Sequence, residues 1–173
     1  MIRKANLDDL EGIEETYNEH FNYEIEHRAF TVFKKGVYPT RNHARKAIEA
    51  GTLYVYEKGN DIAGSLILDQ VQPPEYQSAA WKQPFTADKV MVVHLLLVRP
   101  SLKGKGIASA LIQYAEKLAK NNGCQALRLD TGSQNLPAVT LYQKLGFEIV
   151  GSARMKVGSV IEHSGHLFLE KTL

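Results

Sequence analysis

The residues with the clearest potential for chemistry lie in a short turn at residues 103–108, which read Lys-Gly-Lys-Gly-Ile-Ala. A turn that leads from a strand into a helix presents unpaired backbone N–H groups and the positive end of the helix dipole, and together these bind anions. Gly104 and Gly106 have no side chain to hold an anion away, while Lys103 and Lys105 add positive charge. The turn is therefore a candidate phosphate site, although similar turns also occur as simple strand–helix connections.

Two well-known phosphate-binding patterns do not fit this turn. A P-loop requires Lys-Ser or Lys-Thr directly after its last glycine, whereas Gly106 is followed by Ile107 and Ala108. The dinucleotide fingerprint requires Gly or Ala at its sixth position, where Ser109 stands, and it normally opens a domain. Here roughly a hundred residues of mostly antiparallel strand pattern come first. The turn therefore matches neither of these nucleotide-binding patterns.

The elements around the turn predict a strand–helix–strand unit. Residues 90–98 are the most apolar segment of the chain, and Pro100 ends them. In the helix that follows, the positions that face one way at helical spacing are Ile107, Leu111, Tyr114, Ala115 and Leu118. Gly123 ends this helix, and a strand at residues 125–130 comes after Cys124. We therefore expect a right-handed parallel crossover between the two strands.

The chain before the turn predicts two helices and a hairpin. Residues 2–5 resemble a strand, and a capped helix follows in which one buried face contains Leu10, Ile13, Tyr17 and Phe21. A second helix fits residues 41–50, with Ala44, Ala47 and Ile48 facing inward. Strands at residues 53–56 and 62–68 flank a Lys-Gly-Asn-Asp turn, which favours an antiparallel pair.

The chain after the crossover predicts one more helix and two strands. The helix begins near Asn135, carries Pro137 in its first turn and ends at Gly146. Strands follow at residues 147–155 and at about 167–171. The fold class is therefore α/β, as an α+β mixed sheet with helices on both faces.

The composition limits the protein class. The chain has 173 residues, so we expect one domain over residues 1–173. A formal net charge of +2 provides no general attraction to nucleic acid or to anionic lipid, and no apolar run approaches the ~20 residues of a membrane-spanning helix. The N-terminal residues lack the apolar segment of a secretory signal, and Cys124, the single cysteine, cannot form an internal disulfide. These features predict a cytoplasmic protein.

Two segments, together with the turn, resemble a known family. Residues 93–100 read Val-His-Leu-Leu-Leu-Val-Arg-Pro, and residues 135–147 read Asn-Leu-Pro-Ala-Val-Thr-Leu-Tyr-Gln-Lys-Leu-Gly-Phe. With the turn between them, they resemble the GNAT superfamily of N-acetyltransferases. The order of elements agrees over the whole chain, and the motifs are specific over residues 93–151.

The resemblance implies that the turn binds the pyrophosphate of acetyl-CoA. The family turn reads Gln or Arg, two residues, Gly, one residue, then Gly or Ala; Gly106 and Ala108 match it, and Lys103 departs from its first position. The implied GNAT fold has a central, mostly antiparallel sheet whose one parallel strand pair splays apart around the pantetheine arm. The implied cofactor-binding residues are Leu96, Leu97, Val98, Lys103, Gly104, Lys105, Gly106, Ile107, Ala108, Ser109 and Asn135. Asn135 is also placed to cap the last helix.

The resemblance also implies roles for three side chains in catalysis. Tyr142 corresponds to the tyrosine that protonates the departing CoA thiolate in many family members, while its apolar helix face also fits a core residue. His94 and Asp130 are the candidate bases, since His94 lies on the strand at residues 90–98 and Asp130 at the end of the adjacent strand at residues 125–130. The structural alternatives are a hydrogen-bonded histidine and an aspartate that caps the next turn. Deprotonation of the amine through water is a third route.

Three further residues are candidate contacts for the acceptor. Tyr23 and Glu24 follow the first helix and are assigned by position alone. Trp81 lies in a long irregular stretch at residues 71–88, which is either a lid over the acceptor channel or a surface loop packed by its own side chains. No metal site is expected, because the pair His163 and His166 has no Cys or acid pair nearby.

The sequence therefore predicts direct transfer of an acetyl group from acetyl-CoA to a primary amine of a small molecule or peptide. The alternative is a catalytically silent acyl-CoA-binding or regulatory domain of the same fold. Family habit suggests a homodimer, and neither a nucleic acid nor a membrane is expected as a partner.

Overall fold

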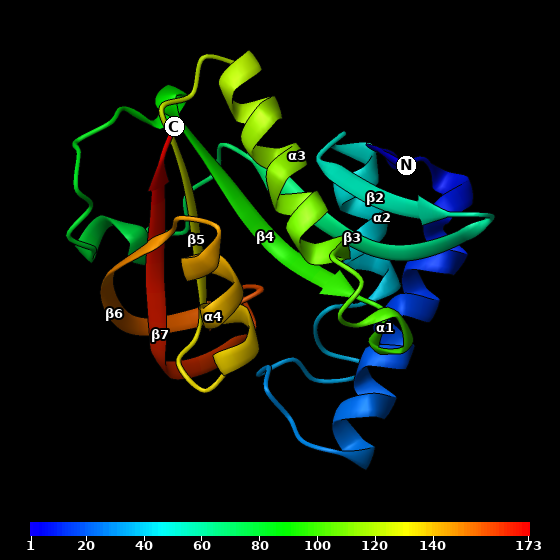
Figure 1. The fold of residues 1–173 in the computed structure, drawn as a ribbon. Helices are drawn as coiled ribbons and strands as arrows, with labels where there is room; N and C mark the ends of the chain where they lie inside the picture. Colours follow the sequence, from blue (N-terminus) through cyan, green and yellow to red (C-terminus); the bar gives the residue numbers. More distant parts are fainter. The chain divides into compact units, whose positions relative to one another are not determined.

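The computed structural model describes residues 1–173 and contains a seven-stranded mixed sheet (Figure 1). The strands are β1 (Ile2–Lys4), β2 (Leu53–Lys58), β3 (Asp61–Asp69), β4 (Val90–Val98), β5 (Ala126–Gly132), β6 (Glu148–Val157) and β7 (Ile161–Thr172). The helices are α1 (Leu10–Glu26), α2 (Arg41–Glu49), α3 (Ile107–Asn121) and α4 (Leu136–Lys144). The predicted fold class is confirmed: β4 and β5 pair in parallel, while β1–β2, β2–β3, β5–β7 and β6–β7 pair antiparallel. None of the helices has the length and apolar character needed to cross a bilayer.

The chain divides into two compact units that share strand β4. The first consists of Met1–Ala29, Phe33–Leu68 and His94–Tyr114, and the second of Phe30–Val32, Asp69–Val93 and Ala115–Leu173. The strand order is β1-β2-β3-β4 in the first unit and β4-β5-β7-β6 in the second.

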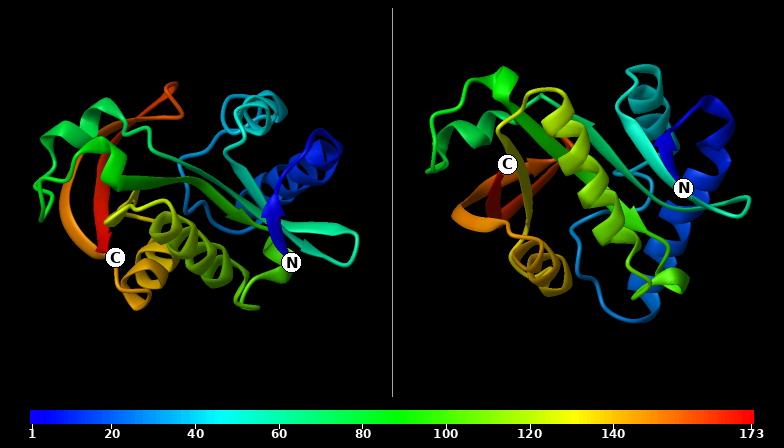
Figure 2. Two further views of the ribbon diagram at one scale, coloured as in Figure 1. Left: turned by 90° about the horizontal axis from the view of Figure 1, so that it is seen from above. Right: turned by 45° about the horizontal axis from the view of Figure 1, so that its top comes forward.

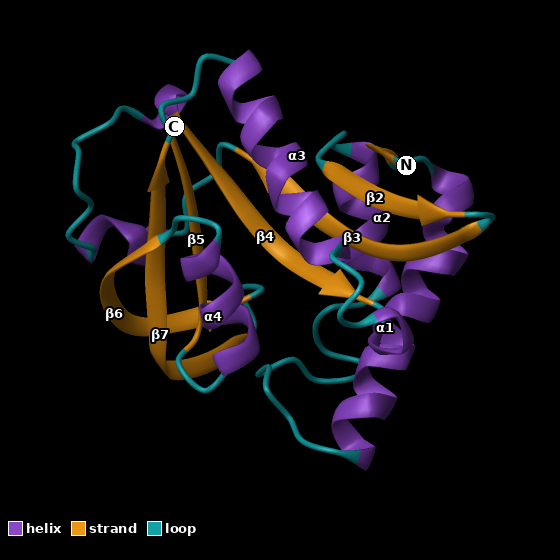
Figure 3. Ribbon diagram, viewed as in Figure 1, coloured by secondary structure: helices purple, strands orange, loops and turns teal.

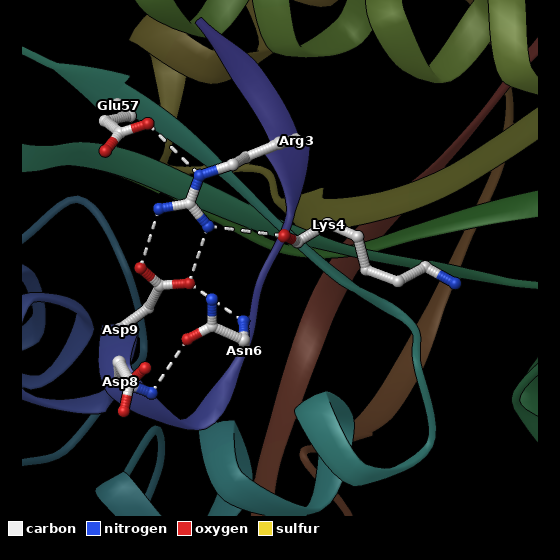
Figure 4. Close-up of polar contacts among 6 residues, drawn as sticks. All are labelled: Arg3, Lys4, Asn6, Asp8, Asp9 and Glu57. Atoms are coloured by element: carbon white, nitrogen blue, oxygen red, sulfur yellow. Dashed lines mark hydrogen bonds and ion pairs between the residues drawn. The ribbon is translucent and has the colours of Figure 1, made fainter.

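An ion-pair cluster fixes the start of helix α1 to the first two strands (Figure 4). Both terminal nitrogens of Arg3 bond the carboxylate of Asp9 at 2.8 Å, and its Nε reaches Glu57 on β2 at 3.1 Å. Asn6 accepts from the Asp8 amide at 2.8 Å, and its own amide donates to Asp9. Because the Arg3 guanidinium stabilises the ionised form, the pKa of Asp9 lies below its usual value.

The core of the first unit confirms the predicted faces of α1 and α2. Its buried members come from α1 (Leu10, Ile13, Tyr17 and Phe21), from α2 (Ala44, Ala47 and Ile48) and from the strands (Leu53, Val55, Ile62, Leu95 and Leu97). Tyr54 points to the opposite face of β2, where its ring lies 5.5 Å from that of Tyr114 on α3. Within this unit, helices therefore cover both faces of the sheet, as the left view of Figure 2 shows.

The buried face of α3 differs from the prediction at two positions. Ile112 and Ala119 are buried, whereas Tyr114 and Leu118, expected to face inward, are only half-buried. Leu111, Ile112, Ala115 and Ala119 are all at most 1% exposed, so the fully buried stripe contains large and small side chains. The apolar periodicity predicted the helix correctly and misjudged its rotation.

Strand β7 is longer than the sequence indicates, because it begins at Ile161 rather than near residue 167. The segment before residue 167 is polar and does not resemble a strand. Its backbone nevertheless pairs with β6, at Met155 with His163 and at Ala153 with His166, and His166 also pairs with Gly132 of β5. Strand pairing on both sides therefore overrides the weak local preference.

The irregular stretch at residues 71–88 contains only short helical turns, drawn in purple among teal loop in Figure 3. Within the second unit, it packs against β7 through aromatic rings. The Tyr76 ring lies 5.1 Å from Trp81 and 5.3 Å from Phe168 of β7, and Trp81 donates through its Nε1 to the Tyr76 carbonyl. The stretch is therefore an ordered layer packed by its own side chains.

Candidate functional site

The glycine turn has the backbone geometry of an anion site. Gly104 and Gly106 adopt left-handed conformations, with φ of 78° and 75°, and the space where a side chain would project is open at both. The first helical hydrogen bond of α3 runs from the Ala110 amide to the Gly106 carbonyl at 2.9 Å. The amides of residues 107–109 precede that bond, so they belong to the unpaired N-terminal group of a 15-residue helix.

The segment before the turn is fixed to β3 and α1. The Nε of Arg99 donates to the Ile62 carbonyl at 2.6 Å, and a terminal nitrogen bonds Glu15 at 2.8 Å. The Ser101 amide donates to Glu19 at 2.8 Å. Sequence reasoning missed these residues. The sequence does contain a pattern that indicates these contacts: Glu15 and Glu19 lie four positions apart on one face of α1, and Arg99 follows an apolar strand.

The side chain of Lys103 reaches toward α1. Its Nζ lies 5.7 Å from the ring centroid of Tyr23, which stacks on His27 at 4.2 Å. Tyr23 and Glu24 lie within α1, which runs to Glu26, rather than after it as the sequence predicted. The Glu24 carboxylate lies 3.5 Å from His20 Nε2, and its side chain is only 9% exposed. The structure thus brings Lys103, the irregular position of the turn, to one of the predicted acceptor contacts.

Strand β4 departs from regular geometry beside His94. Leu95 has a φ of 46°, which is rare for a branched residue and occurs where the surrounding structure enforces it. The parallel pairs run from Val90–Ala126 to Val92–Arg128, before this position. Beyond it, β3 approaches closely, since a Cβ at Gly64 would lie 2.9 Å from the Leu97 carbonyl. A leucine gives no sequence signal for such a conformation, so Leu95 was not predicted.

In the second unit, Tyr142 lies buried on α4 with its ring 5.8 Å from that of Phe147. Burial, with the negative charge of Asp130 as a second cause, raises the pKa of the Tyr142 phenol. The phenol therefore remains protonated over the working pH range and holds a proton to donate, but the raised pKa also makes it a weaker acid toward a thiolate.

Asn135 is the N-cap of α4, as predicted. Its Oδ1 accepts from the Ala138 amide at 3.4 Å, and its Nδ2 lies 3.5 Å from Thr131 Oγ1. Pro137 occupies the first turn. Any contact of Asn135 with a ligand would have to share these atoms.

Asp130, at the end of β5, is held by groups from two other elements. The hydroxyl of Tyr76 donates to its Oδ1 at 2.7 Å, and His166 Nε2 lies 3.7 Å from its Oδ2. Its side chain is 16% exposed, so the carboxylate is still accessible. Sequence reasoning selected Asp130 and missed both partners.

Arg128 lies two residues before Asp130 on β5. It forms a buried ion pair with Glu170 of β7. Arg128 Nε donates to Glu170 at 2.8 Å, and the guanidinium lies 4.1 Å from the ring centroid of Trp81. Trp81 is therefore part of the packing that fixes residues 71–88, and its role as an acceptor contact stays a prediction. A charged residue inside the apolar run Ala-Leu-Arg-Leu was the sequence signal for a buried pair.

The family model described as "Acetyltransferase (GNAT) family" matches residues 11–147, which include the turn, β4, β5 and α4. The chain belongs to the GNAT acetyltransferase family. The match confirms the family that the sequence motifs indicate.

Similar proteins agree with this assignment. The chain is 29% identical over 154 residues to an uncharacterized N-acetyltransferase of Methanocaldococcus jannaschii, over 85% of this chain and 60% of that protein. An N-acetyltransferase from Staphylococcus aureus Mu50 superposes with a TM-score of 0.69 at 25% identity, covering 99% and 97% of the two chains. YncA from Salmonella typhimurium, solved with its cofactor acetyl-CoA, shares the fold with a TM-score of 0.70 at 20% identity, covering 100% and 93%. The chain spans less than two thirds of the length of the curated relatives it matches.

The candidate site residues divide between the two units. The first unit contains the turn, the backbone of Leu96–Val98, His94, Tyr23 and Glu24, whereas the second contains Asp130, Asn135, Tyr142 and Trp81. In the first unit, Lys103 Nζ lies 5.7 Å from the centroid of the Tyr23 ring. In the second unit, the charge of Asp130 contributes to the raised pKa of Tyr142. Residues 1–173 contain no cluster of three or more His, Cys, Asp or Glu that could hold a metal ion.

Proposed function

We propose that this GNAT chain is an N-acetyltransferase that transfers the acetyl group of acetyl-CoA to a primary amine of a small molecule or peptide. The observation that carries the proposal is the turn before α3, where two left-handed glycines leave open space in front of unpaired helix amides. That geometry suits a pyrophosphate. The acetyl-CoA bound to YncA and the names of the relatives support the same cofactor.

The cofactor contacts follow from the same geometry. The turn would bind phosphate oxygens through its amides, with Lys103 and Lys105 adding charge, and the irregular β4 backbone beside Leu95 would bind the pantetheine arm. The residues assigned to the cofactor are Leu96, Leu97, Val98, Lys103, Gly104, Lys105, Gly106, Ile107, Ala108, Ser109 and Asn135.

The reaction is a direct displacement at the thioester. The neutral amine nitrogen attacks the carbonyl carbon, the C–S bond breaks, and the CoA thiolate leaves. Charge on the carbonyl oxygen would be stabilised by a backbone N–H of β4 near Leu95. The amine loses one proton to His94, to Asp130 or to water, and Tyr142 donates one proton to the thiolate. Proton exchange with solvent then returns the base and Tyr142 to their starting protonation states.

In the second unit, the candidate acid Tyr142 and the candidate base Asp130 interact electrostatically. The negative charge of Asp130 is one of the causes that raise the pKa of Tyr142. When Asp130 takes up a proton, that contribution disappears and the pKa of the phenol falls. Uptake of the amine proton by Asp130 would therefore make Tyr142 a better donor at the moment when the thiolate forms.

The acceptor side is assigned to Tyr23, Glu24 and Trp81. Tyr23 and Glu24 are assigned by their position near the end of α1, where the Tyr23 ring stacks on His27. We further propose that residues 1–173 act as one domain in the cytoplasm, with a homodimer as the assembly and without nucleic acid or membrane as partner. A net charge of +2 supports the last point.

The test is release of free CoA thiol from acetyl-CoA in the presence of a panel of peptides, polyamines and simple primary amines. Acceptor-dependent release identifies the enzyme and its acceptor class. Tight binding of acetyl-CoA without release by any amine would instead identify the catalytically silent binding domain. Release that does not depend on an amine would indicate hydrolysis and contradict the proposal.

A further inference from the structure

Four titratable side chains form a connected cluster in the second unit, which we call the carboxylate cluster: Asp130, Tyr76, His166 and His163. Tyr76 donates to Asp130 Oδ1 at 2.7 Å, His166 Nε2 lies 3.7 Å from Oδ2, and the Nδ1 atoms of the two histidines are 2.8 Å apart. Tyr76 and His166 are 1% and 3% exposed. Buried polar groups are costly unless they are paired, so this arrangement is specific.

The sheet register explains how distant residues reach one carboxylate. Asp130 lies directly opposite Phe168, and Gly132 opposite His166, so these side chains share one face of the β5–β7 pair. The Tyr76 ring packs on Phe168 at 5.3 Å, which places its hydroxyl at Asp130. A Cβ at Gly132, opposite His166, would lie 2.5 Å from Oε1 of Gln134, so the Gln134 side chain fills that position.

The contacts determine which ring nitrogens carry protons. Burial, followed by the neighbouring His163, lowers the pKa of His166 to about 4, so the ring is neutral at pH 7 and carries a single proton. The Asp130 carboxylate favours that proton on Nε2, with the N–H dipole pointing toward it. Nδ1 of His166 is then an acceptor, and His163 must donate its Nδ1–H across the 2.8 Å contact. Tyr76 thus donates a hydrogen bond to the carboxylate, and the Nε2–H dipole of His166 points toward it from 3.7 Å, beyond hydrogen-bond distance.

We propose that Tyr76, His166 and His163 are positioning residues that hold Asp130 as the ionised carboxylate which takes the proton of the attacking amine. The inference rests on the proposed acetyltransferase function and selects Asp130 over His94. In the step, the N–C bond forms, the C–S bond breaks, and the ammonium N–H proton moves to a carboxylate oxygen. Tyr142 supplies the proton that the CoA thiolate takes.

Other charged groups around the carboxylate leave this assignment intact. Arg128, on the same face of β5, is paired with Glu170 of β7, and Tyr142 of α4 is a protonated phenol. The hydrogen bond from Tyr76 and the more distant N–H dipole of His166 both favour the ionised form, so removal of either raises the pKa of Asp130. The acidic limb of the pH profile of kcat/KM reports the pKa of the base in the free enzyme, so this limb then moves to higher pH.

The first test needs no activity. Long-range ¹H–¹⁵N NMR of the histidine rings at pH 7 should show His166 protonated at Nε2 and His163 protonated at Nδ1. A His166 ring protonated at Nδ1, or a doubly protonated ring, overturns the cluster. Because this readout is independent of acetyl transfer, it separates failure of the cluster from failure of the proposed function.

The second test uses matched variants and the amine that gives the highest turnover. Tyr76→Phe removes the hydrogen bond to Asp130, and His166→Asn removes the N–H dipole that points toward it. Each change should move the acidic limb of kcat/KM upward by about half to one pH unit, with the KM for acetyl-CoA unchanged. His166→Gln places an amide N–H where Nε2 stood and should restore the wild-type limb. Tyr54→Phe, a tyrosine in the first unit, is the control and should leave the limb in place.

Two outcomes overturn the inference. One is an acidic limb that stays in place in both Tyr76→Phe and His166→Asn. The other is full turnover in Asp130→Asn. If His166→Asn does not fold, the comparison of Tyr76→Phe with Tyr54→Phe decides alone, because each of these changes removes only one hydroxyl.

Discussion

The Tyr76 hydroxyl and the Asp130 carboxylate are joined by a 2.7 Å hydrogen bond. This contact links an irregular stretch, residues 71–88, to the end of a strand that carries a candidate base. Burial, then the charge of Asp130, raises the pKa of the Tyr76 phenol, so that the hydroxyl remains a donor at every working pH. The irregular stretch therefore contributes directly to the chemistry proposed for the site.

The turn before α3 makes a sharp prediction for Gly106→Asp. The change forces a side chain into a left-handed backbone, at a cost of about 1–2 kcal/mol, and places a carboxylate where the pyrophosphate would bind. We expect acetyl-CoA affinity to fall by more than about 100-fold in calorimetry. Lys103→Ala should weaken binding only about 2–5-fold, because the backbone amides provide most of the contacts.

Gly59→Asp is the matched control for this change. Gly59 has a φ of 65° and open space around it, and it lies in the β2–β3 hairpin turn rather than in the anion site. It should bind acetyl-CoA normally despite similar backbone strain. Normal binding by folded Gly106→Asp would remove the turn from the cofactor site.

Tyr142→Phe should reduce kcat by about 100-fold while acetyl-CoA binding is unchanged, since it removes only the proton donor. The raised pKa of the phenol adds a pH prediction for the wild-type enzyme. Loss of the Tyr142 proton cannot limit kcat below about pH 10, so kcat should show no descending limb up to that pH. Unchanged kcat in Tyr142→Phe at saturating substrates would exclude the residue from the mechanism.

The buried pair of Arg128 and Glu170 predicts a large stability effect. Their side chains are 4% and 1% exposed, and Arg128→Met leaves the glutamate charge unpaired in the interior. The free energy of unfolding should fall by about 3–5 kcal/mol in denaturant titrations. The control is Arg154→Met, which breaks an exposed pair with Glu162 and should cost less than about 1 kcal/mol. Equal costs for the two variants would show that Arg128 is not held as described.

His166 predicts how stability depends on pH. Its pKa is about 4 in the folded chain, against an ordinary value near 6.5. Between these values the unfolded chain binds more protons, so the free energy of unfolding falls as pH decreases from about 6.5 to about 4. His166→Gln should lose this part of the pH dependence, and His27→Gln should keep it. Parallel stability curves for wild type and His166→Gln would contradict the assignment.

Much of the fold follows from local patterns in the sequence. Apolar spacing located α1 and α2 with their buried faces, and the continuous apolar run located β4 at residues 90–98. The turn residues located the β2–β3 hairpin, and Asn135 with Pro137 located the start of α4. These signals work because capping, turn chemistry and burial of one face are local properties.

The parts that sequence reasoning missed depend on contacts between distant residues. Leu95 adopts its conformation because its surroundings impose it, and nothing in a leucine indicates that. The polar start of β7 is a strand only because β5 and β6 pair with it, and that pairing brings His166 to Asp130. Tyr76 reaches the same carboxylate from a stretch without periodicity. The sequence therefore predicts the candidate base and not the residues that hold it.

The central claim is that the chain converts acetyl-CoA and a primary amine into CoA and an N-acetyl amine by direct transfer. Quantitative mass spectrometry of one reaction, with the best amine of the panel, measures both products and the mass of the protein together. The account predicts equal amounts of CoA and N-acetyl amine, no acetylated protein, and no turnover without amine. CoA release without N-acetyl amine, or an acetylated protein that passes its acetyl group to the amine, would contradict it.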